Sequence, residues 1–243
     1  EARPGGRPVV VIDPGHGGID GGAATRDGDS EKAIVLALGL AVRDALVHDG
    51  RFRVELTRTT DTFVSLGERV RFAREKRADL MVSLHADKLL YEKGVRGASI
   101  YTVSEKASDV ISARLADSEN AADQAAGIDS SGEDGGVIGD ILFDLTKRET
   151  RQSSIRLARQ LAGSLPQITS MHKNPLRFAG FRVLTAPDVP SVLIETGYLS
   201  SEEDARLMKT AEWRQAMARA IADAIARHLD ENATRVTNSA ARP

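Results

Sequence analysis

Residues 9–12, Val-Val-Val-Ile, restrict the fold of this chain more than any other stretch. This β-branched apolar run is typical of a strand that is buried on both faces of a sheet. Pro14 and Gly15 end the strand, because proline donates no hydrogen bond to a ladder and glycine adopts turn conformations that other residues avoid. His16 therefore follows the carboxyl end of a core strand, which is where ligands bind in open α/β sheets.

The same arrangement recurs later in the chain. A second apolar run, residues 79–84, leads directly into His85, and a third, residues 191–194, leads into Glu195. Carboxyl ends of parallel strands meet at one edge of a sheet, so we expect His16, His85 and Glu195 to lie together. Helical patterns separate the strands, which predicts a single α/β domain with a mostly parallel, twisted sheet flanked by helices.

The remaining elements follow from periodicity and capping signals. Ser30 is expected to cap a helix with Glu31 in its first turn, and Ser200 with Glu203 forms a capping-box pattern for a later helix. Trp213, Met217, Ile221 and Ile225 form an apolar stripe that predicts the last helix. We also expect strands at 53–57, 97–103 and 181–185, and helices at 66–73, 104–126 and 140–165.

Length and composition limit the organisation and the partners. A chain of 243 residues suits one domain, which we place at 8–230, with a linker end at 1–7, an inserted segment at 104–139 and a disordered tail at 231–243. The net charge of −2 without a basic block argues against nucleic acid, and the longest apolar stretch, 33–42, is too short to cross a bilayer. Because the chain begins with Glu1, we expect that a signal peptide and any N-terminal targeting domain have been removed.

The polar residues at the strand ends suggest a metal hydrolase. Cysteine is absent, so a metal site must use histidines and carboxylates. Two histidines and a carboxylate make a ligand set that leaves one zinc position open, and a further carboxylate is then needed for proton transfer; the candidates are His16, His85, Glu31 and Glu195. Taken singly, Glu31 could instead complement the helix dipole, and Asp13 could orient a ligand or cap the turn; for Asp13 we favour the cap.

These motifs, in this order and spacing, resemble the zinc-dependent N-acetylmuramoyl-L-alanine amidases of the amidase 3 type. The resemblance runs from Val9 to about Leu229 through Asp-Pro-Gly-His-Gly-Gly at 13–18, Ser-Leu-His-Ala at 83–86 and Glu-Thr-Gly-Tyr at 195–198. It implies that His16, Glu31 and His85 bind Zn²⁺ and that Glu195 is the general base and acid. The implied substrate is the amide between N-acetylmuramic acid and L-alanine in peptidoglycan.

The inserted segment resembles the one in the cell-division amidases of this family, where a helix covers the site and its glutamate occupies the metal. The matching residues here are Ser118, Glu119 and Asn120. Glu119 continues an apolar stripe through Ile111 and Leu115, so burying that stripe would aim its carboxylate inward. The resemblance implies an autoinhibited periplasmic enzyme of septal cell-wall splitting, opened by an activator of the degenerate LytM type. The alternative is an ordinary surface helix.

Other interpretations of the chain remain open. A His/Glu/His set does not choose the bond, so a zinc peptidase or deacylase acting on another substrate would have the same pattern. A cell-wall-binding module that holds metal without turnover is a second alternative. We expect structural roles for the remaining histidines, with His48 and His228 near helix C-termini and His172 in a loop.

Overall fold

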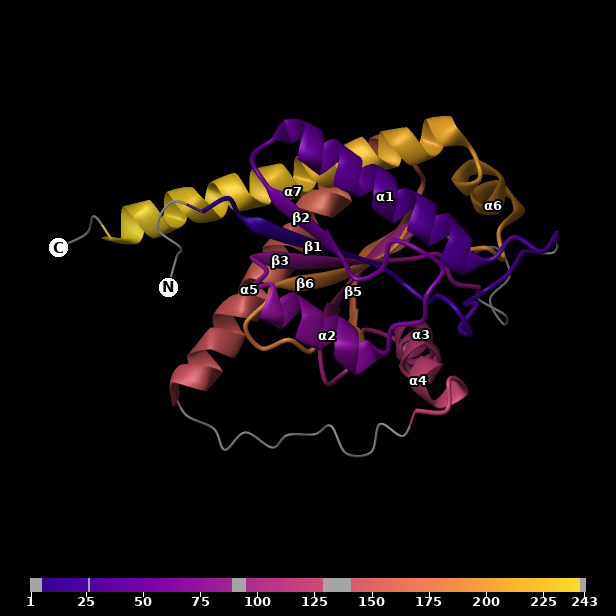
Figure 1. Cartoon of the computed structure of the whole chain (residues 1–243), viewed down its shortest axis with the longest axis horizontal. Coiled ribbons are helices and arrows are strands. Elements are labelled where there is room, and N and C mark those ends of the chain that lie inside the picture. Colours follow the sequence, from indigo (N-terminus) through magenta and orange to yellow (C-terminus); the bar gives the residue numbers. More distant parts are fainter. Residues whose placement is uncertain (1–5, 26, 89–94, 129–140, 241–243) are drawn as a thin grey trace.

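A six-stranded sheet in the order β2-β1-β3-β6-β4-β5 forms the centre of the molecule (Figure 1). The computed structural model describes residues 6–25, 27–88, 95–128 and 141–240. The strands are β1 Val9–Pro14, β2 Arg53–Leu56, β3 Leu80–His85, β4 Ala98–Val103, β5 Met171–Ala179 and β6 Ser191–Glu195. The helices are α1 Glu31–Asp49, α2 Leu66–Glu75, α3 Val110–Asn120, α4 Ala122–Ala125, α5 Ile141–Ser164, α6 Glu202–Met208 and α7 Ala211–Ala240, with 3-10 turns η1 Leu165–Gln167 and η2 Arg182–Leu184.

The direction of the strands brings three of the predicted site residues to one edge. Strands β2, β1, β3 and β6 run parallel, whereas β4 is antiparallel to β6 and parallel to β5. His85 and Glu195 are paired in register at the ends of β3 and β6. The predicted class, a single α/β domain with a mostly parallel sheet, is confirmed.

Alternate residues of the central strands enter two separate cores. Val10 and Ile12 pack with α1, α5 and α7 on one face, whereas Val9 and Val11 pack with α2, α3 and η2 on the other. Figure 1 shows α1 and α7 above the sheet and α2, α3 and α4 below it. Since both faces are covered, β1 can be apolar at every position from 9 to 12.

The strand predicted at 181–185 is wrong. Residues 182–184 form the 3-10 turn η2, and the strand is β5, which contains His172. The polar neighbours of His172 and the following Pro175 predict a loop, which is not what the structure has. An edge strand keeps polar residues in solvent and tolerates proline, and β5 lies at the edge of the sheet.

Several element boundaries also differ from the prediction. The helix expected from 104 begins at Val110, because the Asp109 carboxylate accepts a hydrogen bond from Ser112 N and caps it. Ser201, not Ser200, caps α6, and Ser30 precedes α1 without a capping hydrogen bond from its side chain. Helix α5 agrees closely with the expected 140–165. Residues 129–139 of the predicted inserted segment lie outside the described residues.

The end of the chain differs from the expected disordered tail, because α7 continues to Ala240 and includes residues 231–240. His228 consequently lies within α7 and not near a helix end. Its Nε2 lies 3.0 Å from Ser153 Oγ on α5, so it joins the two helices in the core. Among the described residues, no helix has the length and apolar character needed to cross a membrane.

Candidate active site

His16, Glu31 and His85 converge at the carboxyl edge of the sheet. His16 lies in the loop after β1, Glu31 begins α1, and His85 ends β3. Glu31 Oε1 lies 3.2 Å from His16 Nε2 and 3.3 Å from His85 Nδ1. The structure therefore brings together the three residues predicted as metal ligands.

The loop after β1 must be tight for these side chains to meet. His16 itself has a left-handed backbone with φ 58°, which is uncommon for a residue other than glycine. A Cβ atom on Gly15 would lie 2.4 Å from His85 Cε1, and one on Gly22 would lie 2.6 Å from His16 Cδ2. Both glycines are needed because the histidine rings pack directly against the backbone.

The nitrogens that face the cluster are free to bind a cation. His16 Nδ1 is held 2.8 Å from Asp20 Oδ2, which directs Nε2 inward. His16 Nε2 and His85 Nδ1 are buried and form no hydrogen bond within the described part of the chain. Two buried imidazole nitrogens beside a carboxylate are what a metal site requires, since buried polar atoms are otherwise hydrogen-bonded.

Glu119 of α3 completes the cluster from the opposite side. Its Oε2 lies 3.2 Å from His85 Nδ1, and its Oε1 lies 3.7 Å from His16 Nε2. One ligand atom from each of His16, Glu31, His85 and Glu119 lies within 4.8 Å of the others. Four donors at zinc bond lengths of about 2 Å are spaced by roughly 3.3 Å in a tetrahedron, and the separations of His85 Nδ1 from Glu31 and Glu119 and of His16 Nε2 from Glu31 are close to this value.

The charges of the cluster shift its pKa values. Burial lowers the pKa of His16, but Glu31 and Glu119 outweigh it and raise that pKa well above the ordinary value. For His85, burial is likewise opposed by Glu119 and Glu31, which raise the pKa to about 10. Burial raises the pKa of Glu31, whereas both histidines lower it further, to well below its usual range. The carboxylates thus supply the negative charge that a bound cation would neutralise.

Glu195 lies next to the cluster without being part of it. Its Oε2 accepts a hydrogen bond of 3.0 Å from Asp87 N, while Oε1 is buried and has no partner among the described residues. Burial, together with the nearby carboxylates of Glu31 and Asp87, raises the pKa of Glu195 well above its ordinary value. A carboxyl group with a raised pKa and a free oxygen is suited to move a proton.

Asp13 is not a turn cap, so the role that we favoured is wrong. It is fully buried, and it accepts hydrogen bonds from Thr57 Oγ1 at 2.6 Å, Ser83 Oγ at 2.7 Å and Arg69 Nη1 at 2.6 Å. Arg69 in turn donates to His16 O at 2.8 Å. Asp13 therefore supports the His16 loop through Arg69 and does not touch the ligand set itself.

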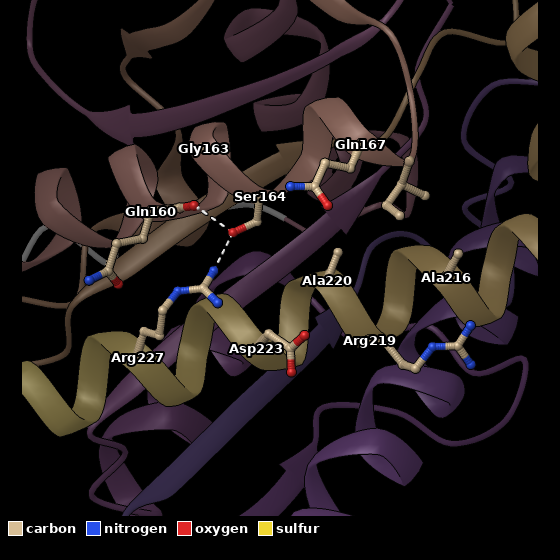
Figure 2. Close-up of a pocket in the computed structure, with 10 residues that line it drawn as sticks. Gln160, Gly163, Ser164, Gln167, Ala216, Arg219, Ala220, Asp223 and Arg227 are labelled. Atoms are coloured by element: carbon tan, nitrogen blue, oxygen red, sulfur yellow. Dashed lines mark hydrogen bonds between the residues drawn. The ribbon is translucent and has the colours of Figure 1, made fainter.

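The cluster of His16, Glu31, His85 and Glu119 is almost closed to solvent. The hollow at His16, His85 and Glu119 has a volume of about 10 Å³, which is room for about one water-sized particle. A much larger hollow of about 630 Å³ lies between α5 and α7 (Figure 2), where Arg227 donates to Ser164 Oγ. That hollow is lined by Gln160, Gly163, Ser164, Gln167, Ile168, Ala216, Arg219, Ala220, Asp223 and Arg227, and by none of the predicted site residues.

Comparison with known proteins identifies the family of the chain. The family model described as N-acetylmuramoyl-L-alanine amidase (Amidase_3) matches residues 10–227. The chain belongs to this family. The matched region contains every predicted site residue, and the fold and family expected from the sequence are confirmed.

Named amidases share much of the sequence. The chain is 40% identical to N-acetylmuramoyl-L-alanine amidase AmiA of Escherichia coli K12, over 92% of this chain and 76% of that protein. It is 36% identical to AmiC of E. coli O6:H1, over 94% of this chain but only 54% of AmiC. Among solved structures, AmiC2 of Nostoc punctiforme superposes with a TM-score of 0.63 at 27% identity, over 93% of this chain and 98% of that one.

Three residues that support the candidate site were not predicted from the sequence. Asp20 orients His16, and Arg58 and Arg69 hold the loop backbone. Arg58 follows β2 at the carboxyl edge of the sheet, so the rule that identified His16 and His85 would have found it too. Asp20 and Arg69 carry no comparable signal, because neither directly follows a strand; Asp20 is one polar residue of the loop that contains His16, and the partners of Arg69 become its neighbours only in the folded chain.

Proposed function

We propose that this domain is a zinc-dependent amidase that hydrolyses the amide between the lactyl group of N-acetylmuramic acid and L-alanine in peptidoglycan. The observation that carries the proposal is the pair of buried, unpartnered nitrogens, His16 Nε2 and His85 Nδ1, which face Glu31 Oε1. Membership of the amidase family supports the choice of bond.

In this proposal His16, Glu31 and His85 hold the ion. Zinc, when bound there, supplies a Lewis acid for the scissile carbonyl. Asp20 keeps the His16 ring oriented through Nδ1, and the backbone N–H groups of Ala23 and Ala86 donate to the Glu31 carboxylate at 2.9 and 2.7 Å. These supports hold the ligands in place whether or not the ion is present.

Glu195 is proposed as the general base and acid. Its Oε1, which has no partner among the described residues, can accept a proton from the attacking water, and its raised pKa favours holding that proton until it passes to the nitrogen of the leaving amine as the C–N bond breaks. The hydrogen bond from Asp87 N fixes the other oxygen, so the carboxyl group keeps one orientation during the transfer.

Glu119 is proposed as a removable fourth ligand that keeps the enzyme inactive. Its carboxylate is directed at both histidines, and the hollow of about 10 Å³ leaves no space for a sugar-linked peptide. Displacement of α3 would free one metal position and open the site together. A chain in this state needs an activator, for which we propose a protein of the degenerate LytM type.

The proposed setting is the periplasm, during septal splitting of the cell wall. Peptidoglycan lies outside the cytoplasm, so an enzyme that cleaves it must act there. The similarity to AmiA and AmiC of Escherichia coli supports this assignment.

Mass spectrometry of the products tests the proposed reaction. The zinc-loaded Glu119→Ala variant should convert purified muropeptides into two products. One is a free peptide that begins with L-alanine, and the other is a sugar whose lactyl group ends in a newly formed carboxylate. Cleavage at another amide would identify a different peptidase or deacylase. Bound zinc without any cleavage, also after addition of an activator, would identify a binding module and contradict the proposal.

A further inference from the structure

Arg58 is a buried arginine whose donors all go to the backbone. Its residue is 4% exposed, and no carboxylate within the described residues accepts a hydrogen bond from it. Nε donates to Pro14 O at 2.9 Å, Nη1 to Thr60 O at 3.0 Å, and Nη2 to Gly15 O at 2.7 Å and Lys32 O at 2.8 Å. A buried charge without an ion pair is costly, so its partners indicate what it is needed for.

Three of these four carbonyls belong to the two segments that carry the proposed metal ligands, and the fourth, Thr60 O, lies in Arg58's own loop. Pro14 and Gly15 directly precede His16, and Lys32 directly follows Glu31. One guanidinium therefore links the His16 loop to the first turn of α1. Arg69 holds the same loop from its own side, through Pro14 O at 2.9 Å and His16 O at 2.8 Å.

The His16 loop requires such support. A left-handed backbone is strained at a residue with a side chain, and His16 has φ 58°. Carbonyls 14, 15 and 16 all point toward the two guanidiniums, which stabilises this conformation. Burial and the charge of Arg69 lower the pKa of Arg58 to about 10, so the side chain stays cationic at neutral pH.

We propose that Arg58 is a positioning residue of the metal site, which holds His16 Nε2 and Glu31 Oε1 at their 3.2 Å separation and thereby sets the affinity for zinc. This inference rests on the proposed function in one respect, namely that the cluster binds zinc. Lysine cannot replace Arg58, because an ammonium group lacks the planar set of donors that reaches four carbonyls.

Zinc affinity, measured by competition with a chromophoric chelator, tests the inference. Arg58→Lys and Arg58→Ala should bind zinc about 10- to 100-fold more weakly than the unmodified chain. Arg156→Lys is the matched control, because Arg156 reaches Asn232 on α7 and not the site, and its affinity should be unchanged. Guanidinium ion at millimolar concentration should partly restore zinc binding to Arg58→Ala and not to Arg58→Lys.

The outcomes separate the two proposals. If the unmodified chain does not bind zinc, the proposed function fails. If it does, and Arg58→Lys binds zinc equally tightly, the role of Arg58 is refuted. Should the variants not fold, NMR of the arginine side chains in the unmodified chain decides: the Arg58 Nε–H should be protected from exchange with and without zinc, and free exchange in the metal-free protein would overturn the inference.

Discussion

Glu119 and Glu195 are both buried carboxylates near the same two histidines, but their contacts give them different properties. Both oxygens of Glu119 are directed at His16 or His85, which suits its proposed role as a ligand. Glu195 keeps one oxygen on Asp87 N and the other unpartnered, and its pKa is raised well above normal by burial and by nearby carboxylates. In the proposed function these contacts separate the two glutamates into a metal-facing group and a proton-carrying group.

The role of Glu195 predicts a loss of turnover without a loss of metal. Glu195→Gln should lower the rate of dye release from labelled peptidoglycan by about 100-fold or more, since a positioned acid–base group contributes about 10²–10⁴-fold. The zinc content should not change. Glu212→Gln, at the exposed start of α7, is the control. A Glu195→Gln enzyme that keeps its rate would exclude the proposed role.

Asp13 predicts a pH-dependent contribution to stability. Burial raises its pKa, but Arg69, Thr57 and Ser83 lower it further, so the folded pKa lies below the unfolded one. The stabilisation is therefore complete above about pH 4 and is lost as the pH falls through the folded pKa. Asp13→Asn should cost about 3–5 kcal/mol at neutral pH. Urea unfolding should show this difference shrinking below about pH 4, and a constant difference would contradict the prediction.

At the scale of elements, α3 is attached to the domain at both ends. Asp109 at its start pairs with the buried Arg177 of β5 at 2.6 Å. Asn120 at its end donates to Gly180 O at 2.8 Å and accepts from Arg182 N at 2.8 Å. Asp123 of α4 accepts from Leu66 N at 2.9 Å. These contacts hold Glu119 against His16 and His85.

The position of α3 predicts that removing one carboxylate activates the enzyme. Glu119→Ala should raise the basal rate of dye release from labelled peptidoglycan at least several-fold. The substitution removes the carboxylate that, in the proposed function, occupies the fourth metal position beside His16 and His85. Asp117→Ala is the matched control, since Asp117 lies exposed on the same helix and should leave the rate unchanged. Equal rates for both variants, with zinc retained, would rule out inhibition through Glu119.

The elements that could be predicted are those whose environment is uniform along the sequence. Strands β1, β3 and β6 are buried throughout and read as apolar runs. Strand β5 could not be recognised, because its residues before Pro175 include none that is buried, and after it the polar Arg177 is buried while the apolar Leu176 and Phe178 are exposed at the sheet edge. Helix caps shifted by one residue where neighbouring serines offered equivalent signals, as at Ser200 and Ser201.

The site was predictable to the extent that strand ends mark it. His16, His85 and Glu195 each follow an apolar run, and Glu31 and Glu119 sit at recognisable positions of helices. Asp13 was misjudged because its partners Thr57, Arg69 and Ser83 lie at least 44 residues away in the chain. A sequence pattern does not reveal such long-range hydrogen bonds.

For the molecule as a whole, removing the metal should lower stability. Binding at 1,000 times Kd stabilises a fold by about 4 kcal/mol, which corresponds to a shift of about 10 °C for a chain of this size. Thermal melts with a chelator and after zinc readdition should show a reversible shift of this order. The triple variant His16→Ala, His85→Ala, Glu119→Ala should not respond to zinc, and a response would place the ion elsewhere.

The strand order has a consequence for when the enzyme can become active. Strand β6 lies between β3 and β4 in the middle of the sheet, although it is the last of the six strands in the sequence. During synthesis His16 and His85 leave the ribosome long before Glu195. The six-stranded sheet is not complete until β6 inserts between β3 and β4. With Glu195 in its proposed role, an unfinished or partly threaded chain cannot cut peptidoglycan.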